Sequence, residues 1–110
     1  MTNHELIARF EDGTIAPGAF GHREHLRLAW LYLRRHGRPE AEPRLLAGLR
    51  ALASRAGQPE KFNAALTLAW VAHIDAASAA LAPDHSFDDL LLHSPQLLDR
   101  RSVREMAQTL

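Results

Sequence analysis

Glycine and proline divide this chain into short segments, and each segment carries the apolar periodicity of a helix. Gly13, Gly37 and Gly57 each follow a run in which apolar residues recur every three or four positions, and glycine commonly stands just past the end of a helix. No stretch alternates apolar and polar residues as a half-buried strand does. The sequence therefore predicts an all-α protein.

Helix-starting signals define the expected elements. Thr2 with Glu5, and Ser86 with Asp89, have the spacing of a capping box, and Pro59 suits the first turn of a helix. The expected helices cover residues 3–12, 22–36, 40 or 43 to 56, 59–81 and 86–93, followed by a turn over 95–99 and a short segment capped by Ser102 and Glu105. The fourth helix is expected to be the longest.

A chain of 110 residues has room for one hydrophobic core. Short connections between long helices favour antiparallel neighbours. We therefore expect a single-domain up-down bundle of four main helices, with short helices at the carboxyl end.

Composition narrows the function classes. Thirteen basic and thirteen acidic residues give no net charge, so we expect neither a nucleic-acid nor a membrane partner. Cysteine is absent, which excludes disulfides, thiolate metal sites and cysteine nucleophiles. No signal peptide or membrane-spanning stretch is evident, and a cytoplasmic location is expected. Lys61 is the only lysine, which together with the many alanines we interpret as codon bias.

The helix over 22–36 places histidines on its apolar side. His22, His25 and His36 share the arc of the apolar residues Leu26, Ala29, Trp30 and Leu33. The opposite, charged side, which is expected to be solvated, carries Arg23, Glu24, Arg27, Arg34 and Arg35.

The pair formed by His22 and His25, at i and i+3, resembles half of a metal site. Imidazole suits zinc, copper, iron or nickel, but no carboxylate pair stands at ligand spacing on another inward face. The cofactor therefore stays unknown, with a divalent transition metal as one possibility. Alternatively, His22 caps the helix and His25 is a hydrogen-bonded core residue.

A candidate site follows from the direction of the helices. In an up-down bundle the second and fourth helices run the same way, so His22 and His25 lie near Asn63 and Thr67, which are one turn apart. The candidate ligand-binding residues are Phe20, His22, His25, Asn63, Thr67 and Trp70. The alternatives are that Asn63 and Thr67 bond to a neighbouring segment and that Trp70 belongs to the core.

Two functions remain open. The first is a small-molecule pocket at this end, binding or catalytic and with or without a metal, in which an imidazole acts as base or ligand. No reaction class follows, and whether the protein is an enzyme stays undecided. The second is a homodimeric or partner-binding module with structural histidines, because a short helix cannot bury all of its leucines. The surfaces in question are Leu90, Leu91, Leu92, Leu97 and Leu98, and the alanine side of the fourth helix with Ala65, Ala72, Ala76 and Ala79.

Three stretches resemble a family of small bacterial all-helical proteins without an assigned function. They are FGHREHLRLAW over 20–30, KFNAALTLAW over 61–70 and SFDDLLLHSPQLLDR over 86–100. The resemblance covers most of the chain and implies the helical fold but no chemistry. It also implies a histidine at the position of Asn63, following an aromatic residue, which would add a third imidazole. Asparagine stands there instead, and residues 101–110 depart from the continuation that the resemblance implies.

Overall fold

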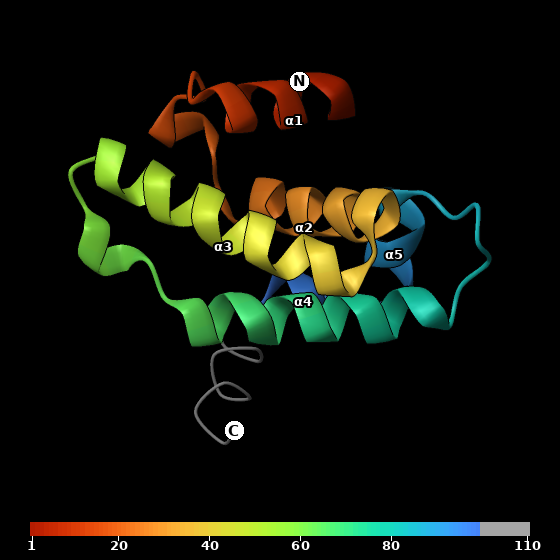
Figure 1. Cartoon of the computed structure of the whole chain (residues 1–110). Coiled ribbons are helices and arrows are strands. Elements are labelled where there is room, and N and C mark those ends of the chain that lie inside the picture. The colour runs from red at the N-terminus through yellow and green to blue at the C-terminus, as the bar shows by residue number, and fades with distance from the viewer. Residues whose placement is uncertain (100–110) are drawn as a thin grey trace.

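The chain folds entirely into helices and their connections over the residues that the computed structural model describes, 1–99 (Figure 1). Five are α-helices: α1 (Asn3–Asp12), α2 (His22–His36), α3 (Arg38–Arg55), α4 (Ala64–Ala79) and α5 (Phe87–His93). Three are 3-10 turns: η1 (Pro17–Ala19), η2 (Pro59–Lys61) and η3 (Pro95–Leu98). The predicted all-α class is confirmed for this part of the chain, whereas the segment expected from Ser102 and Glu105 lies outside it.

The expected caps explain several helix ends. Thr2 accepts a hydrogen bond from the Glu5 amide at 3.1 Å, and α1 ends at Gly13 with a φ of 79°. Ser86 and Asp89 bond each other's backbone amides at the start of α5. The bounds of α1 and α2 are those that the sequence predicts, because each has a start signal and a terminating glycine.

The expectation for the fourth helix is wrong at its start. Pro59 begins the separate turn η2, and the backbone is extended at Phe62 and Asn63. Asn63 then caps α4, because its side-chain oxygen accepts a hydrogen bond from the Leu66 amide at 3.0 Å. Asparagine favours this capping position over the helix interior. As a result α4 has 16 residues and α3, with 18, is longer.

The third helix begins earlier than expected. Gly37 ends α2, and α3 starts directly at Arg38, so one residue separates the two helices. Pro39 falls in the first turn, where its missing amide has no helical partner to lose. Pro43 lies inside α3 and is accommodated early in the helix.

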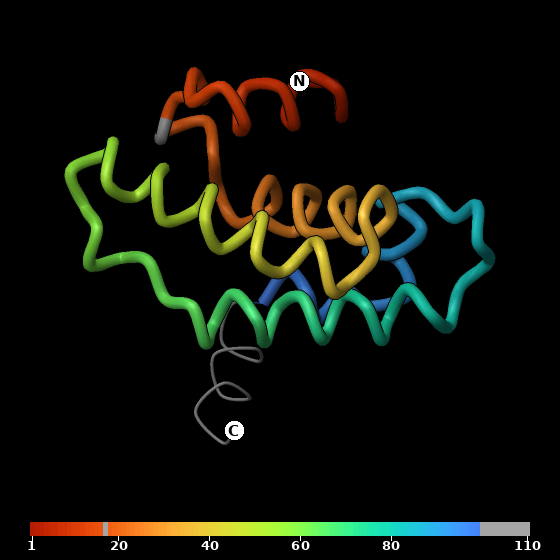
Figure 2. Tube along the Cα trace, viewed as in Figure 1, coloured from red at the N-terminus to blue at the C-terminus, as the bar shows by residue number. Residues whose placement is uncertain are grey.

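α2 is the central helix. α1 packs against α2 and α3, and α4 packs on the other side of the same pair (Figures 1 and 2). α3 runs antiparallel to α2 and α4, so the amino termini of α2 and α4 lie at the same end. α5 and η3 close the molecule against α4 and α2. These contacts make a layered arrangement around α2.

The core follows from this central position. α2 buries residues on more than one side, Leu28 and Tyr32 as well as Leu26 and Trp30. Further fully buried anchors come from α1, α3, α4, α5 and η3: Leu6, Leu45, Val71, Ile74, Leu90 and Leu97. Gly48 of α3 lets α1 approach closely, since a Cβ there would overlap the Phe10 ring.

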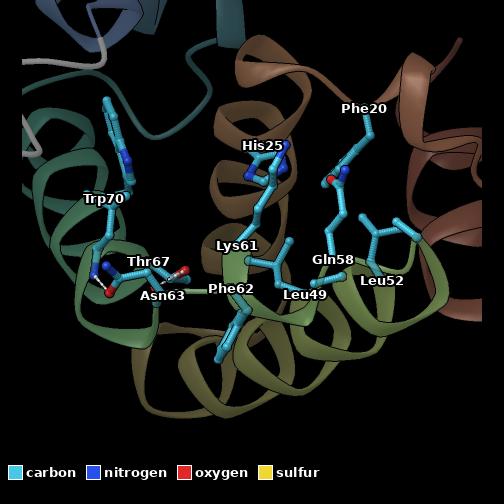
Figure 3. A pocket seen from close by; sticks show the side chains of 13 residues that line it. Phe20, His25, Leu49, Leu52, Gln58, Lys61, Phe62, Asn63, Thr67 and Trp70 are labelled. Atoms are coloured by element: carbon cyan, nitrogen blue, oxygen red, sulfur yellow. Dashed lines mark hydrogen bonds between the residues drawn. The ribbon is translucent and has the colours of Figure 1, made fainter.

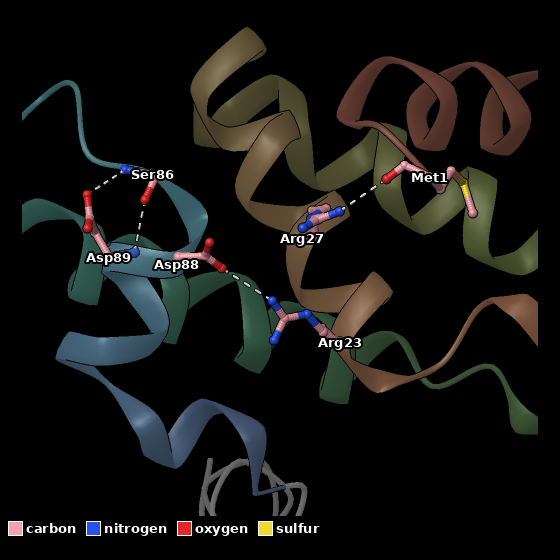
Figure 4. Close-up of polar contacts among 6 residues, drawn as sticks. All are labelled: Met1, Arg23, Arg27, Ser86, Asp88 and Asp89. Carbon is pink, nitrogen blue, oxygen red and sulfur yellow. Dashed lines mark hydrogen bonds and ion pairs between the residues drawn. The ribbon is translucent and has the colours of Figure 1, made fainter.

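The arginines of α2 connect it to the segment after α4. Arg34 donates to the carbonyl oxygens of Pro83 at 3.0 Å and His85 at 3.3 Å. Arg23 pairs with Asp88 of α5 at 3.3 Å (Figure 4). Arg23, Arg34 and Arg35 remain exposed, as expected of a solvated face, whereas Glu24 and Arg27 are half-buried. Among residues 1–99, no helix is both long and apolar enough to cross a bilayer.

Candidate functional site

A cleft opens at the end where α2 and α4 begin. It consists of three hollows that share His25 and Trp70 in their linings, and we call it the His25 cleft. Figure 3 shows the first of these hollows. The first hollow has a volume of about 280 Å³. It is lined by Phe20, His25, Leu49, Leu52, Ala53, Ala56, Gln58, Lys61, Phe62, Asn63, Leu66, Thr67 and Trp70.

The structure brings the six candidate residues together. Phe20, His25, Asn63, Thr67 and Trp70 all line the first hollow, whereas His22 lines the two adjoining ones. They come from the loop before α2, from α2 itself and from α4 with its cap. Their proximity results from the shared direction of α2 and α4.

His22 is held by the fold. Its Nε2 lies 2.9 Å from the carbonyl oxygen of Leu97 in η3, so Nε2 carries the proton and donates it. The ring also meets the Trp70 ring edge-on, with centroids 4.7 Å apart. This side chain therefore fastens the start of α2 to the carboxyl end of the fold.

His25 differs from its neighbour. The sequence places it on the core-facing arc, but the residue is exposed and borders the cleft between α2, α3 and α4. Its ring packs against Phe20 with centroids 4.2 Å apart. His25 lines all three hollows, and it is the imidazole best placed to meet a ligand.

Asn63 and Thr67 have roles within α4. The side-chain oxygen of Asn63 caps the helix by accepting a hydrogen bond from the Leu66 amide. The backbone carbonyl of Asn63 accepts a hydrogen bond from the Thr67 hydroxyl at 3.0 Å. These bonds lie within α4 and its cap, so among residues 1–99 neither side chain makes the bond to a neighbouring segment that the alternative predicted. The Asn63 amide nitrogen and the lone pairs of the Thr67 hydroxyl are the parts left to a ligand.

The two tryptophans occupy different environments. Trp30 is 6% exposed, and its indole N–H donates to Nε2 of the buried His85 at 3.0 Å. His85 Nδ1 donates in turn to the Ala82 carbonyl at 2.7 Å. Trp70 is only partly buried and forms a wall of the His25 cleft. Trp30 therefore belongs to the core, whereas Trp70 packs against the core with one part of its side chain and borders the cleft with another.

Lys61 was missed by the sequence reasoning. It ends η2 and lines two of the hollows, yet its rarity was interpreted as codon bias. A lone lysine in an arginine-rich chain, inside one of the motifs over 61–70, is the signal that would have found it. Gln58, at the other end of the same turn, was also missed.

Metal binding has few donors here. Among the described residues no group of three or more His, Asp or Glu side chains is arranged to hold a metal ion. His22 and His25 are the two imidazoles at the cleft, and one nitrogen of His22 already donates to Leu97. Two imidazoles fall short of the three or four protein ligands of most zinc sites.

No family model, curated protein or solved structure matches this chain.

Proposed function

We propose that this protein binds a small organic molecule in the His25 cleft. The observation that carries the proposal is the convergence of five of the six candidate residues, from separate parts of the chain, on one hollow of about 280 Å³. That convergence agrees with the up-down order of the four long helices, which is part of the proposal. We also propose that the protein is cytoplasmic and that it belongs to the small bacterial helical family described above.

The size and lining of the hollow suit a compact ligand. Small-molecule pockets are typically about 300–1,000 Å³, with apolar walls and a few polar groups that orient the ligand. The first hollow, at about 280 Å³, lies just below that range and has this composition. A ligand of one or two rings, or a short chain, is the expected size.

The roles of the residues follow from their positions. Phe20 and Trp70 provide aromatic walls, and His25, Gln58 and Lys61 provide hydrogen-bonding groups. We propose a metal-free site because the described residues of the cleft offer only two imidazoles as metal ligands. Should the bound molecule also be a substrate, His25 is the group positioned to take its proton.

The test uses 1-naphthalenemethanol as a neutral probe and NMR of the two indole N–H signals. Trp70 borders the cleft and Trp30 is buried elsewhere, so the Trp70 signal should move on titration and the Trp30 signal should stay. His25→Ala should weaken binding several-fold without unfolding the protein. His93→Ala, which removes an exposed histidine outside the cleft, should leave the affinity unchanged. An absent response at Trp70, or unfolding of His25→Ala, would contradict the proposal.

A second candidate is the homodimeric or partner-binding module. Leu90, Leu91 and Leu97 are buried, whereas Leu92 is 82% and Leu98 47% exposed. Leu92 and Leu98 are the leucines that such a contact would cover. Sedimentation of the wild type and of Leu92→Asp tests this, and a wild type that stays monomeric at high concentration would count against it.

A further inference from the structure

The His25 cleft has an uneven distribution of charge. Lys61 lines two of its hollows, and His22 and His25 add two imidazoles. Within the described part of the chain, no aspartate or glutamate lines any of the three hollows. Since acidic and basic residues are equally numerous in the whole sequence, this local imbalance bears on which ligands are favoured.

Glu24 and Glu60 adjoin lining residues of the cleft, but neither forms an ion pair with Lys61. Glu24 accepts a hydrogen bond from the Gly21 amide at 3.1 Å and so serves the start of α2. Glu60 precedes Lys61 in η2 and is exposed, outside the lining. Lys61 forms no ion pair with any residue between 1 and 99. A cationic ligand would therefore find no partner charge, whereas an anion would meet an ammonium group.

The walls around this cation are flat and apolar. Trp70 and Phe20 present rings, and Leu49, Leu52 and Leu66 complete the apolar lining. The ring of His25 is tilted by 37° against Phe20, which places an N–H-bearing ring beside an aromatic one. Lys61 and His25 both line the same two hollows, so one ligand can reach both (Figure 3).

The single positive charge of Lys61 favours some anions over others. One ammonium group carries one full positive charge, and it suits a carboxylate, which is a monoanion with two acceptor oxygens. A phosphate dianion would require a further cation to balance its second charge, and the cleft lining supplies none besides the imidazoles. The observations thus favour a carboxylate.

We infer that the His25 cleft selects small aromatic or similarly flat apolar carboxylates, with the carboxylate at Lys61 and His25 and the apolar body against Trp70 and Phe20. This inference rests on the proposed function and specifies the chemistry of its ligand. The carboxylate end determines the preference among ligands of equal size. The apolar body supplies the part of the affinity that all such ligands share.

Three probes with the same naphthalene body separate these contributions. They are 1-naphthoate, the neutral 1-naphthalenemethanol and the cationic 1-naphthylmethylammonium, each titrated calorimetrically at neutral pH. The carboxylate should bind about tenfold more tightly than the alcohol, as a charge-assisted hydrogen bond provides. The ammonium compound should bind most weakly. Equal affinity for carboxylate and alcohol, or preference for the cation, would overturn the inference while leaving the cleft a binding site.

Variants test the assigned cation. Lys61→Gln should lower the affinity for 1-naphthoate about tenfold and leave the alcohol unchanged, and Lys61→Arg should restore most of the loss. The matched control is Arg44→Gln, which removes an exposed positive charge from α3 outside the cleft lining. Lys61 is exposed, so circular dichroism should show all three variants folded. A Lys61→Gln protein that keeps its preference for 1-naphthoate contradicts the inference, and failure of all three probes contradicts the proposed function itself.

Discussion

The Nε2 atom of His22 lies 2.9 Å from the carbonyl oxygen of Leu97, which stands 75 residues later in the chain. This bond joins the first turn of α2 to η3, and both residues are partly or fully buried. His22→Ala should therefore reduce the free energy of unfolding by roughly 1–3 kcal/mol, because the buried carbonyl loses its donor. Urea denaturation measures the loss, with the exposed His93→Ala as control. Equal stability of the two variants would show that the bond contributes nothing.

The raised pKa of Tyr32 should lower the free energy of unfolding at alkaline pH. Burial, together with its hydrogen bond to Glu11 at 3.0 Å, raises the pKa of Tyr32 above the ordinary value of 10.0. Folding therefore favours the protonated phenol, and this contribution is complete below about pH 10 and is lost as pH rises toward the folded-state pKa. Tyr32 is the only tyrosine, so tyrosinate absorbance reports it directly. The stability difference between wild type and Tyr32→Phe should be constant below about pH 10 and shrink above it. A tyrosine that ionises at its ordinary pKa in the folded protein would refute this expectation.

Two substitutions at Asn63 should separate its role as the cap of α4 from its role in the lining of the cleft. Asn63→Ala should destabilise the protein by about 1 kcal/mol, because α4 loses its side-chain cap. Asn63→Asp keeps the cap and should keep the stability, but it adds a negative charge to the cleft lining. The aspartate variant should consequently bind 1-naphthoate more weakly than the wild type does. Thermal denaturation and calorimetry on the same three proteins give both results, and unchanged affinity in Asn63→Asp would weaken the assignment of the carboxylate position.

A side chain at position 48 should destabilise the contact between α1 and α3. A Cβ at this position would overlap the Phe10 ring, so Gly48→Ala should cost roughly 1–3 kcal/mol. Gly18→Ala is the matched control, since a Cβ there meets nothing within 4 Å. Adding Phe10→Leu to Gly48→Ala should recover part of the loss by making room. Recovery absent from the double variant would indicate that the cost arises elsewhere.

Much of the fold follows from local signals in the sequence. Start and stop residues such as Thr2, Gly13 and Gly37 act within one turn of the helix they delimit, so they can be read without knowledge of the rest of the structure. The shared end of α2 and α4 was also predictable, because it depends only on the number of intervening helices. These two inferences were enough to predict that Phe20, His25 and Asn63 lie near one another.

The remaining features depend on packing. The exposure of His25 could not be predicted, because helical periodicity shows which side faces inward and not where the neighbouring helix ends. Asn63 was placed inside a helix because Pro59 and Asn63 both favour helix starts, and the sequence does not show which one prevails. The structure resolves this competition with two elements, and the break between them places Lys61 at the mouth of the cleft.

That break has a consequence for how the protein can change. The rim from Gly57 to Asn63 buries no residue of the core, and it is bounded by the glycine turn at one end and the cap of α4 at the other. Gly57, with a φ of 73°, and Asn63, which caps α4, are constrained by the fold, but substitutions at the exposed Gln58, Glu60 and Lys61 can alter the charge and shape of the entrance while α2, α3 and α4 retain their packing. The part of the ligand preference that depends on the charge of the entrance is therefore encoded apart from folding stability, which makes these three positions the natural place to engineer a new specificity.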